Sequence, residues 1–133
     1  MEENAVKESE EDVFGPVIYA YTRKQAIEDG VLVDVTQTAK EAGFQFPFAM
    51  TASVWSLIEN IPRKYSHEDI TSRLWDVLMV AKASIRAAEA KQDVVFFDVI
   101  LHHEGGSRVH LKLHCGPGDN GEPVLTLMLP NED

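Results

Sequence analysis

The side chains best suited to chemistry in this sequence include a group of histidines and bases between residues 103 and 114. Side chains two positions apart on a β-strand point to the same face, so one face is expected to collect His103, Arg108, His110, Lys112 and His114. Three interpretations stay open: a metal site, a basic patch for an anionic ligand or a partner's carboxylates, and a solvated sheet face. Because HxH, HExxH and paired-cysteine spacings are absent and Arg108 would repel a cation, we expect no metal ion here.

A second group of polar and aromatic residues lies between residues 19 and 35. Thr22 and Gln25 have the spacing of a capping box, and Gly30 supplies the left-handed stop of a short helix. This helix is expected to separate two strand-like runs. The candidate binding residues around it are Tyr19, Tyr21, Arg23 and Asp34. If the protein were an enzyme, its pocket would be expected beside these side chains.

Three further features invite a chemical interpretation but fit structural roles better. Cys115 is the only cysteine, and a cysteine among apolar strand residues commonly packs as a small hydrophobe. The glycine-rich segment 116–121 lacks the GxxxxGK[ST] pattern and lies between strands, so it is expected to be a loop. Asp98 is expected on the apolar side of its strand, as a buried carboxylate with a hydrogen-bonding role. These residues give no reason to expect a cofactor.

The elements that position these residues predict an α+β fold, with N-terminal strands and short helices, one long core helix and a C-terminal three-stranded antiparallel meander. Apolar residues at helical spacing predict the long helix from Ser66 to about residue 91. Glycine-containing connections between three apolar runs predict the meander. The other expected elements are strands at 17–21 and 31–35, helices at 23–29, 37–42 (capped by Thr36) and 51–60, an extended segment at 44–48, and meander strands at 94–103, 109–115 and 124–129.

The pairing of the first two meander strands is predicted from a two-residue turn at 105–106, which would place His103 opposite Arg108. In this register the core side of the sheet carries apolar residues of both strands and two polar ones. They are Phe96, Ile100, Val109, Leu111, Leu113 and Cys115, with Asp98 and His102 among them. The long helix is expected to cover this side, and the helix residues that make the contact are Leu74, Leu78 and Ile85.

The charge and composition of the chain limit its partners. With 22 acidic and 12 basic residues in 133 positions, the formal net charge is −10. Residues 1–12 hold six acids and one base and are expected to form a disordered acidic tail, followed by a single α+β domain at 13–133. An acidic protein is poorly suited to direct binding of a nucleic-acid backbone. The single cysteine favours the reducing cytoplasm, and no apolar run reaches the roughly 20 residues of a membrane span.

The segment from residue 14 to residue 55 resembles an uncharacterised family of small acidic proteins carried by bacteria, phages, plasmids and integrative elements. The resemblance rests on an aromatic strand, on the sequence Ala-Ile-Glu-Asp-Gly-Val-Leu-Val-Asp-Val at residues 26–35, and on the Phe-Pro-Phe at residues 46–48. That family has no assigned chemistry, so the resemblance implies a mobile-element context without a mechanism.

A looser likeness links the same segment to the opening of NAD-dependent ADP-ribosyltransferases. In those enzymes the strand offers His or Arg to the cofactor, whereas this sequence has Tyr19 and Tyr21. We therefore expect a noncatalytic accessory or interaction protein that binds a host or element protein. A small transferase-like enzyme and an acidic inhibitor that mimics nucleic acid are the alternatives, and homodimer formation stays open.

Overall fold

The computed structural model describes residues 21–88 and 92–133, which contain four α-helices, one 3₁₀ helix and five β-strands. In chain order they are α2 (Arg23–Glu28), β2 (Leu32–Asp34), α3 (Thr36–Glu41), β3 (Phe48–Thr51), α4 (Ala52–Glu59), the 3₁₀ helix η1 (Arg63–Tyr65), α5 (Ile70–Ala87), β4 (Val94–His103), β5 (Gly106–Pro117) and β6 (Pro123–Met128). The expected tail at 1–12 and all but the last residue of the expected strand at 17–21 lie outside the described residues.

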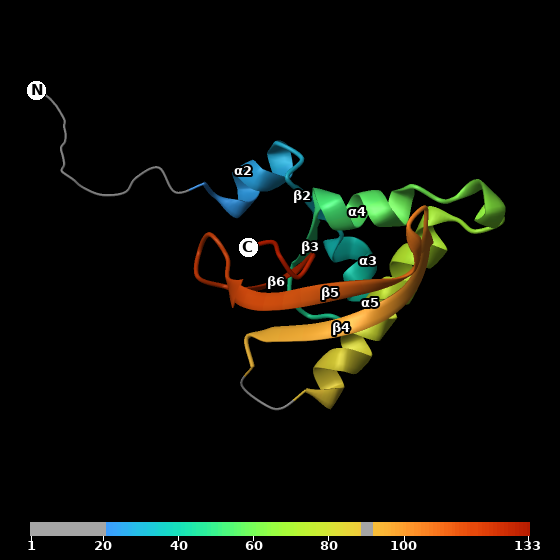
Figure 1. The fold of residues 1–133 in the computed structure, drawn as a ribbon. Helices are drawn as coiled ribbons and strands as arrows, with labels where there is room; N and C mark the ends of the chain where they lie inside the picture. The colour runs from blue at the N-terminus through green and yellow to red at the C-terminus, as the bar shows by residue number, and fades with distance from the viewer. Residues whose placement is uncertain (1–20, 89–91) are drawn as a thin grey trace, which may run out of the picture.

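The five strands form one mixed sheet in the order β2-β3-β6-β5-β4 (Figure 1). The C-terminal strands pair antiparallel as β4–β5 and β5–β6, and β2 pairs antiparallel with β3. β3 joins β6 in the parallel sense, with Phe48 opposite Leu125. The chain therefore has the predicted α+β class, but its C-terminal strands belong to a larger sheet that includes residues from the first half of the chain.

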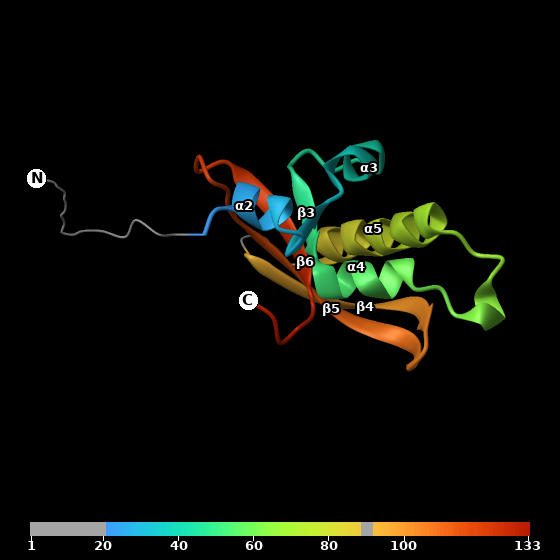
Figure 2. The ribbon, with the colours of Figure 1, turned by 90° about the horizontal axis from the view of Figure 1, so that it is seen from above.

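One face of the sheet is covered by α4 and α5, which lie next to each other across it (Figure 2). The apolar core lies between these helices and the sheet. Its largest fully enclosed side chains are Phe48, Met50, Val54, Ile58, Val77, Leu78, Leu111 and Leu127. Along β3 and β6, Ala49 and Val124 alternate with core residues and so point to the second face. There α2 buries Ala26, and this helix covers part of the second face.

The boundaries of α5 differ from those predicted. The helix has 18 residues and begins at Ile70, because the side chain of Asp69 accepts the backbone N–H of Ser72 and caps the helix there. The predicted start at Ser66 falls instead directly after η1. The helix ends at Ala87, short of the predicted end near residue 91.

The two short N-terminal helices begin in different ways. α2 has the predicted capping box, and Gly30 beyond its end has a φ of 79°. The expectation that Thr36 caps the next helix is wrong, because Thr36 is the first residue of α3 and the N-cap residue is Val35, whose side chain makes no capping hydrogen bond. The hydroxyl of Thr36 instead donates to Asp34 at 2.5 Å and accepts the backbone N–H of Phe48 at 3.0 Å. Thr36 therefore connects α3 to the start of β3.

β3 is the strand that the sequence does not predict. An extended segment is expected at 44–48 and a helix from Thr51, but residues 48–51 form a strand in which all four residues are buried. β3 lies between β2 and β6, so both of its edges are paired. A run of four residues, with Pro47 before it and the helix cap Thr51 at its end, is too short to carry a periodic signal.

The pairing of β4 with β5 also differs from the prediction. Arg108 lies opposite Ile100 and not opposite His103, a shift of three positions along β4. The turn consists of residues 104–105, and the ladder is irregular between Ile100 and His103. A shift by an odd number of positions moves the side chains of a strand to the opposite face. The residues of β4 that are wrongly predicted on the core side, and are exposed, are Phe96, Asp98 and Ile100.

The predicted contact between the long helix and the meander forms only in part. The residues that share one buried cluster are Leu74, Leu78, Leu111 and Leu113. Ile85 is exposed near the end of α5, and Ile100 lies on the other face of the sheet. The residues of β4 that enter the core are Phe97, Val99 and Leu101.

Candidate functional site

The observed register gathers five side chains on the exposed face of β4 and β5. We call this surface the open face, and it consists of Phe96, Asp98, Ile100, Arg108 and His110. Asp98 lies opposite His110, and Ile100 lies opposite Arg108. Phe96 and Ile100 are 56% and 61% exposed although both belong to a ten-residue strand. Two large apolar side chains therefore flank a charged centre.

Hydrogen bonds hold the charged centre of the open face together. One carboxylate oxygen of Asp98 accepts a hydrogen bond from Arg108 at 3.2 Å, and the other contacts Nδ1 of His110. The hydrogen bond with His110, followed by that from Arg108, holds the pKa of Asp98 below its usual 3.8. The ring of His110 also stacks on Phe96, with the ring centroids 5.9 Å apart. The prediction of a buried carboxylate is therefore wrong, because Asp98 is exposed and has its partners on the solvent side.

Within the part of the chain that the structure describes, β4 is one of the two edge strands of the sheet, and one hydrogen bond shows the direction of its backbone groups. The N–H of Cys115 donates to the carbonyl of Asp93 at 2.8 Å. These two residues continue the β4–β5 register, in which Val94 lies opposite His114, so they form a directly opposite pair. Hydrogen-bonded pairs alternate along an antiparallel ladder, so the odd-numbered residues up to Val99 direct their backbone groups to β5. The even-numbered residues from Val94 to Ile100 direct their N–H and C=O groups to the free edge.

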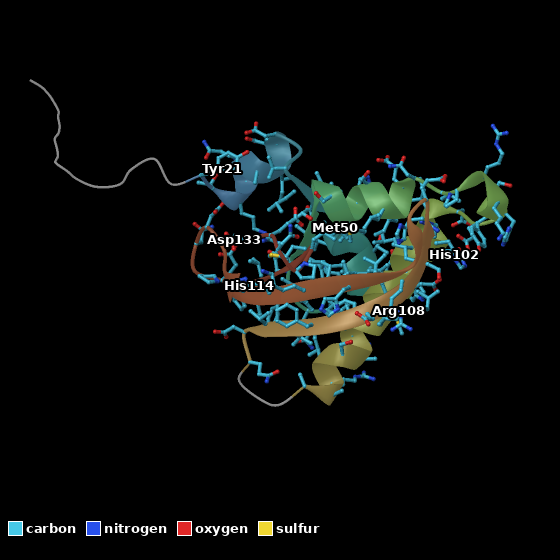
Figure 3. All side chains as sticks on the ribbon, in the orientation of Figure 1. Tyr21, Met50, His102, Arg108, His114 and Asp133 are labelled. Atoms are coloured by element: carbon cyan, nitrogen blue, oxygen red, sulfur yellow. The ribbon has the colours of Figure 1, made fainter. Side chains whose placement is uncertain are left out.

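The predicted group of basic side chains is only partly brought together. Arg108 and His110 share the open face, whereas His103 lies at the hairpin turn, where its Nδ1 accepts the N–H of Gly105. His114 lies toward the opposite end of β5 from Arg108 (Figure 3). Within residues 21–88 and 92–133, no three His, Cys, Asp or Glu side chains are grouped as metal ligands. Lys112 lies on the same face, opposite Phe96, and its ammonium group donates to the carbonyl of Glu132.

Two of the N-terminal candidate residues meet on the face of the sheet that α2 covers. The guanidinium of Arg23 donates to Oγ1 of Thr126 at 2.7 Å and to the carbonyl of Leu125 at 2.8 Å. Arg23 and Asp34 line the same pocket, which has a volume of about 280 Å³. Burial lowers the pKa of Arg23 below its usual value. Arg23 thus anchors α2 to β6 and also forms one wall of the pocket.

Of the two tyrosines in the same prediction, only Tyr21 is described, and it does not line this pocket. The hydroxyl of Tyr21 donates to Asp29 at 2.6 Å, and this hydrogen bond raises the pKa of Tyr21 above its usual 10.0. Tyr19 lies outside the described residues. A general acid or base is most effective with a pKa near the working pH, and the pKa of Tyr21 is displaced away from it.

Sequence reasoning misses Asp119, which lies in the loop between β5 and β6 and lines the pocket. Its carboxylate oxygens accept the backbone N–H groups of Arg23 at 2.9 Å and of Lys24 at 3.1 Å. These hydrogen bonds hold the pKa of Asp119 below its usual 3.8. An aspartate in a loop of glycine and proline is an ordinary turn residue, so no local signal distinguishes one that caps a distant helix.

Comparison with known protein families assigns the chain to a group. Residues 12–133 match a family of unknown function, DUF6573. The chain belongs to this family. The match shows a family of unknown function over residues 12–133, whereas the resemblance in the sequence covers residues 14–55. No curated protein and no solved structure matches the chain. None of the helices in the described ranges combines the length and apolar character that a bilayer crossing requires.

Proposed function

We propose that this protein acts by binding, and that it accepts an extended segment of a partner protein as an additional strand beside β4. The partner is a protein of the host or of the mobile element to which the sequence resemblance points. The observation that carries the proposal is the edge of β4 that pairs with no other described strand, where outward backbone groups adjoin the exposed Phe96 and Ile100.

The two edges of the sheet offer very different templates. β2 has three residues, whereas β4 has ten. A long edge strand presents unpaired N–H and C=O groups to another chain, and proteins commonly prevent such pairing with a charged side chain. In the middle of β4 that charge belongs to Asp98, but the guanidinium of Arg108 pairs with it and His110 contacts its other oxygen. The charge at the centre of β4 is therefore a weak obstacle to strand addition.

An added strand would gain both main-chain and side-chain interactions. Each backbone hydrogen bond at the free edge contributes about 0.5–1.5 kcal/mol net. Cross-strand contacts with Phe96 and Ile100 contribute about 0.2–1 kcal/mol each. These two side chains alternate with core residues along β4, so the partner segment needs apolar side chains at alternate positions on one face. A short apolar segment of a larger protein fits this requirement.

A proline at position 96 tests the backbone part of the proposal. Phe96 directs its N–H to the free edge, so Phe96→Pro removes one docking donor and leaves the β4–β5 ladder intact. Phe96→Thr is the matched variant, because it keeps the N–H and removes the aromatic ring. Each variant of the full chain would carry a photocrosslinking amino acid at Ile100 and be incubated with host lysate. Mass spectrometry would then identify the crosslinked peptide.

The expected result is a crosslink to an extended, alternately apolar segment of one protein. Phe96→Pro should abolish this crosslink, and Phe96→Thr should weaken it. The comparison is valid if both variants keep the melting midpoint of the unaltered protein. The same crosslinker at Met79, on the exposed side of α5, should not label that segment. A crosslink that persists in Phe96→Pro, or labelling of the same segment from Met79, would refute strand addition. Labelling of a second copy of the chain would replace the host or element partner with a homodimer.

A second candidate function has one observation in its favour, the meeting of Arg23 and Asp34 at a single pocket. The corresponding activity is that of a small NAD-dependent ADP-ribosyltransferase-like enzyme. Incubation of the purified protein with labelled NAD and host lysate tests it. Transfer of label that disappears in Arg23→Ala, in a variant that still melts cooperatively, would replace the binding function with the transferase. Absence of transfer would remove this candidate.

A further inference from the structure

A groove opens beside the core, on the face of the sheet opposite to the open face. It lies between the C-terminal turns of α5, the loop from α3 to β3, and inward-facing side chains of β4, β5 and β6. Its volume is about 440 Å³. The apolar part of its wall consists of Phe44, Phe46, Ile85, Val95, Leu113 and Leu125.

The lip of the groove is formed by apolar side chains that the fold leaves in contact with water. Phe46 is 41% exposed and Ile85 is 38% exposed. Beneath them Phe44 is buried and meets Phe48 edge to face, with the ring centroids 5.0 Å apart. Covering apolar surface is favourable by roughly 25 cal/mol per Å². The groove therefore favours an occupant with an apolar body.

Two bases stand beside this apolar wall, Lys82 and Arg86, one helical turn apart on α5. Nζ of Lys82 donates to the carbonyl of Ala42 at 3.0 Å. A Cβ atom at Gly43 would collide with this ammonium group, and Gly43 also has a φ of 103°. The glycine thus allows the loop to approach Lys82, which fixes a positive charge at the groove.

The charges at the groove are the reverse of those of the whole chain. Among the described residues that line the groove, the bases are Lys82 and Arg86 and the acid is Asp93, whereas the chain has a net charge of −10. A positive rim over an apolar wall is complementary to a molecule that has an apolar body and one anionic head. The groove also has the size of a small-molecule site, for which the typical range is roughly 300–1,000 Å³.

From these features we infer that the groove binds a small apolar carboxylate, of the class of medium-chain fatty acids. The chain of the ligand lies against Phe46 and Ile85, and its carboxylate lies toward Arg86 and Lys82. This site is independent of strand addition at β4, because it uses the inward face of the sheet and none of the open-face residues.

Cys115 provides the reporter, because it is the only cysteine and lines the groove. Alkylation of the full chain by N-ethylmaleimide is followed by intact mass. Decanoate is the probe, and decyltrimethylammonium, with the same chain length and the opposite charge, is its control. Both are used below the concentration at which they form micelles. At about twice its dissociation constant, decanoate should slow alkylation roughly threefold and in a saturable manner. The cation should leave the rate unchanged.

Three variants locate the site. Arg86→Gln should raise the decanoate concentration for half-protection by about threefold, since the pair is partly exposed to solvent. Ile85→Glu, which places an acid at the lip, should abolish protection. Arg63→Gln removes an exposed charge outside the groove, on η1, and should leave protection unchanged. Equal protection by the cation, or identical behaviour of Arg86→Gln and Arg63→Gln, would overturn the inference.

A second measurement, by NMR, tests decanoate binding without relying on the reactivity of the Cys115 thiol. Decanoate should shift the backbone amide resonances of Val95, Leu113 and Leu125, which line the groove from three strands. The resonances of the open face should stay in place. Shifts that are absent, or that spread evenly over the surface, would overturn the inference even if Cys115 reacts too slowly to report.

Discussion

The hydroxyl of Thr36 accepts the backbone N–H of Phe48 at 3.0 Å and thereby joins the first residue of α3 to the first residue of β3. Phe48 is completely buried, so water cannot take the place of this acceptor. Thr36→Val should therefore lower the free energy of unfolding by about 1–3 kcal/mol. Urea denaturation measures the loss. Thr38→Val is the control, because the Thr38 hydroxyl makes no hydrogen bond within the described residues, and an equal loss in both would contradict the prediction.

Adjacent prolines in β4 should have unequal effects on stability. Val95 directs its N–H into the β4–β5 ladder, whereas Phe96 directs its N–H outward. Val95→Pro leaves the carbonyl of Leu113 without its donor and should destabilise the protein by about 1–3 kcal/mol more than Phe96→Pro. Thermal melts followed by circular dichroism measure both variants. Equal losses would show that the ladder does not alternate as the bond between Cys115 and Asp93 indicates.

The guanidinium of Arg73 is buried and connects three parts of the fold. It donates to the carbonyl of Ile58 at the end of α4, to the carbonyl of His102 in β4, and to Glu68 at 2.7 Å. Arg73→Met should cost about 3–5 kcal/mol, because it leaves these acceptors without a donor. Arg86→Met, at an exposed position of the same helix, should change stability by less than about 0.5 kcal/mol. Denaturant titration of the two variants would contradict this prediction if their midpoints coincide.

Neighbouring residues of α5 should differ in their contribution to the core. Leu78 is completely buried, and Met79 is 41% exposed. Leu78→Ala should lower the free energy of unfolding by about 2–5 kcal/mol through lost contacts and a residual cavity. Met79→Ala should have a much smaller effect. A small loss in Leu78→Ala, measured by calorimetry, would mean that α5 does not cover the sheet as described.

The carboxyl group of Asp98 should titrate below its usual pKa of 3.8, because His110 and then Arg108 donate to its ionised form. A lowered pKa in the folded state means that the interaction stabilises the protein at neutral pH and is lost as the pH falls through that pKa. NMR titration of the carboxyl carbon measures it. His110→Ala should raise the pKa more than Arg108→Ala does. His114→Ala, on the same face of β5, should leave it unchanged, and a rise in this control would contradict the assignment.

Local signals allow the start of the described chain to be predicted well. The capping box of Thr22 and Gln25 and the positive φ of Gly30 are all present, because each depends on residues within one or two turns. The faces of β4 could not be predicted in the same way. Residues 94–101 are apolar at every position except Asp98, so alternation does not identify the buried side. Their orientation depended on the turn, which lies one residue earlier than expected and is followed by an irregularity in the ladder.

The residues of the candidate sites also differ in whether local sequence patterns predict them. Arg23 and Asp34 belong to one local motif, and the structure brings them to one pocket. Asp119 reaches that pocket across 96 positions of the chain, and Arg73 meets His102 across 29. Such contacts depend on how the sheet is assembled, and neither hydrophobic periodicity nor a capping pattern in a single sequence predicts them. The open face was missed for the same reason, since it exists only in the observed register of β4 and β5.

The parallel pairing of β3 with β6 also determines when the protein can fold during its synthesis. Phe48 leaves the ribosome 77 residues before Leu125, its partner across the two strands. Until β6 emerges, β3 has an unpaired edge and the apolar side chains of Phe48 and Met50 lack one wall of the core. Contacts between such distant residues close slowly. The nascent chain therefore exposes β3, whose four residues are all buried in the folded protein, until residues 123–128 are available.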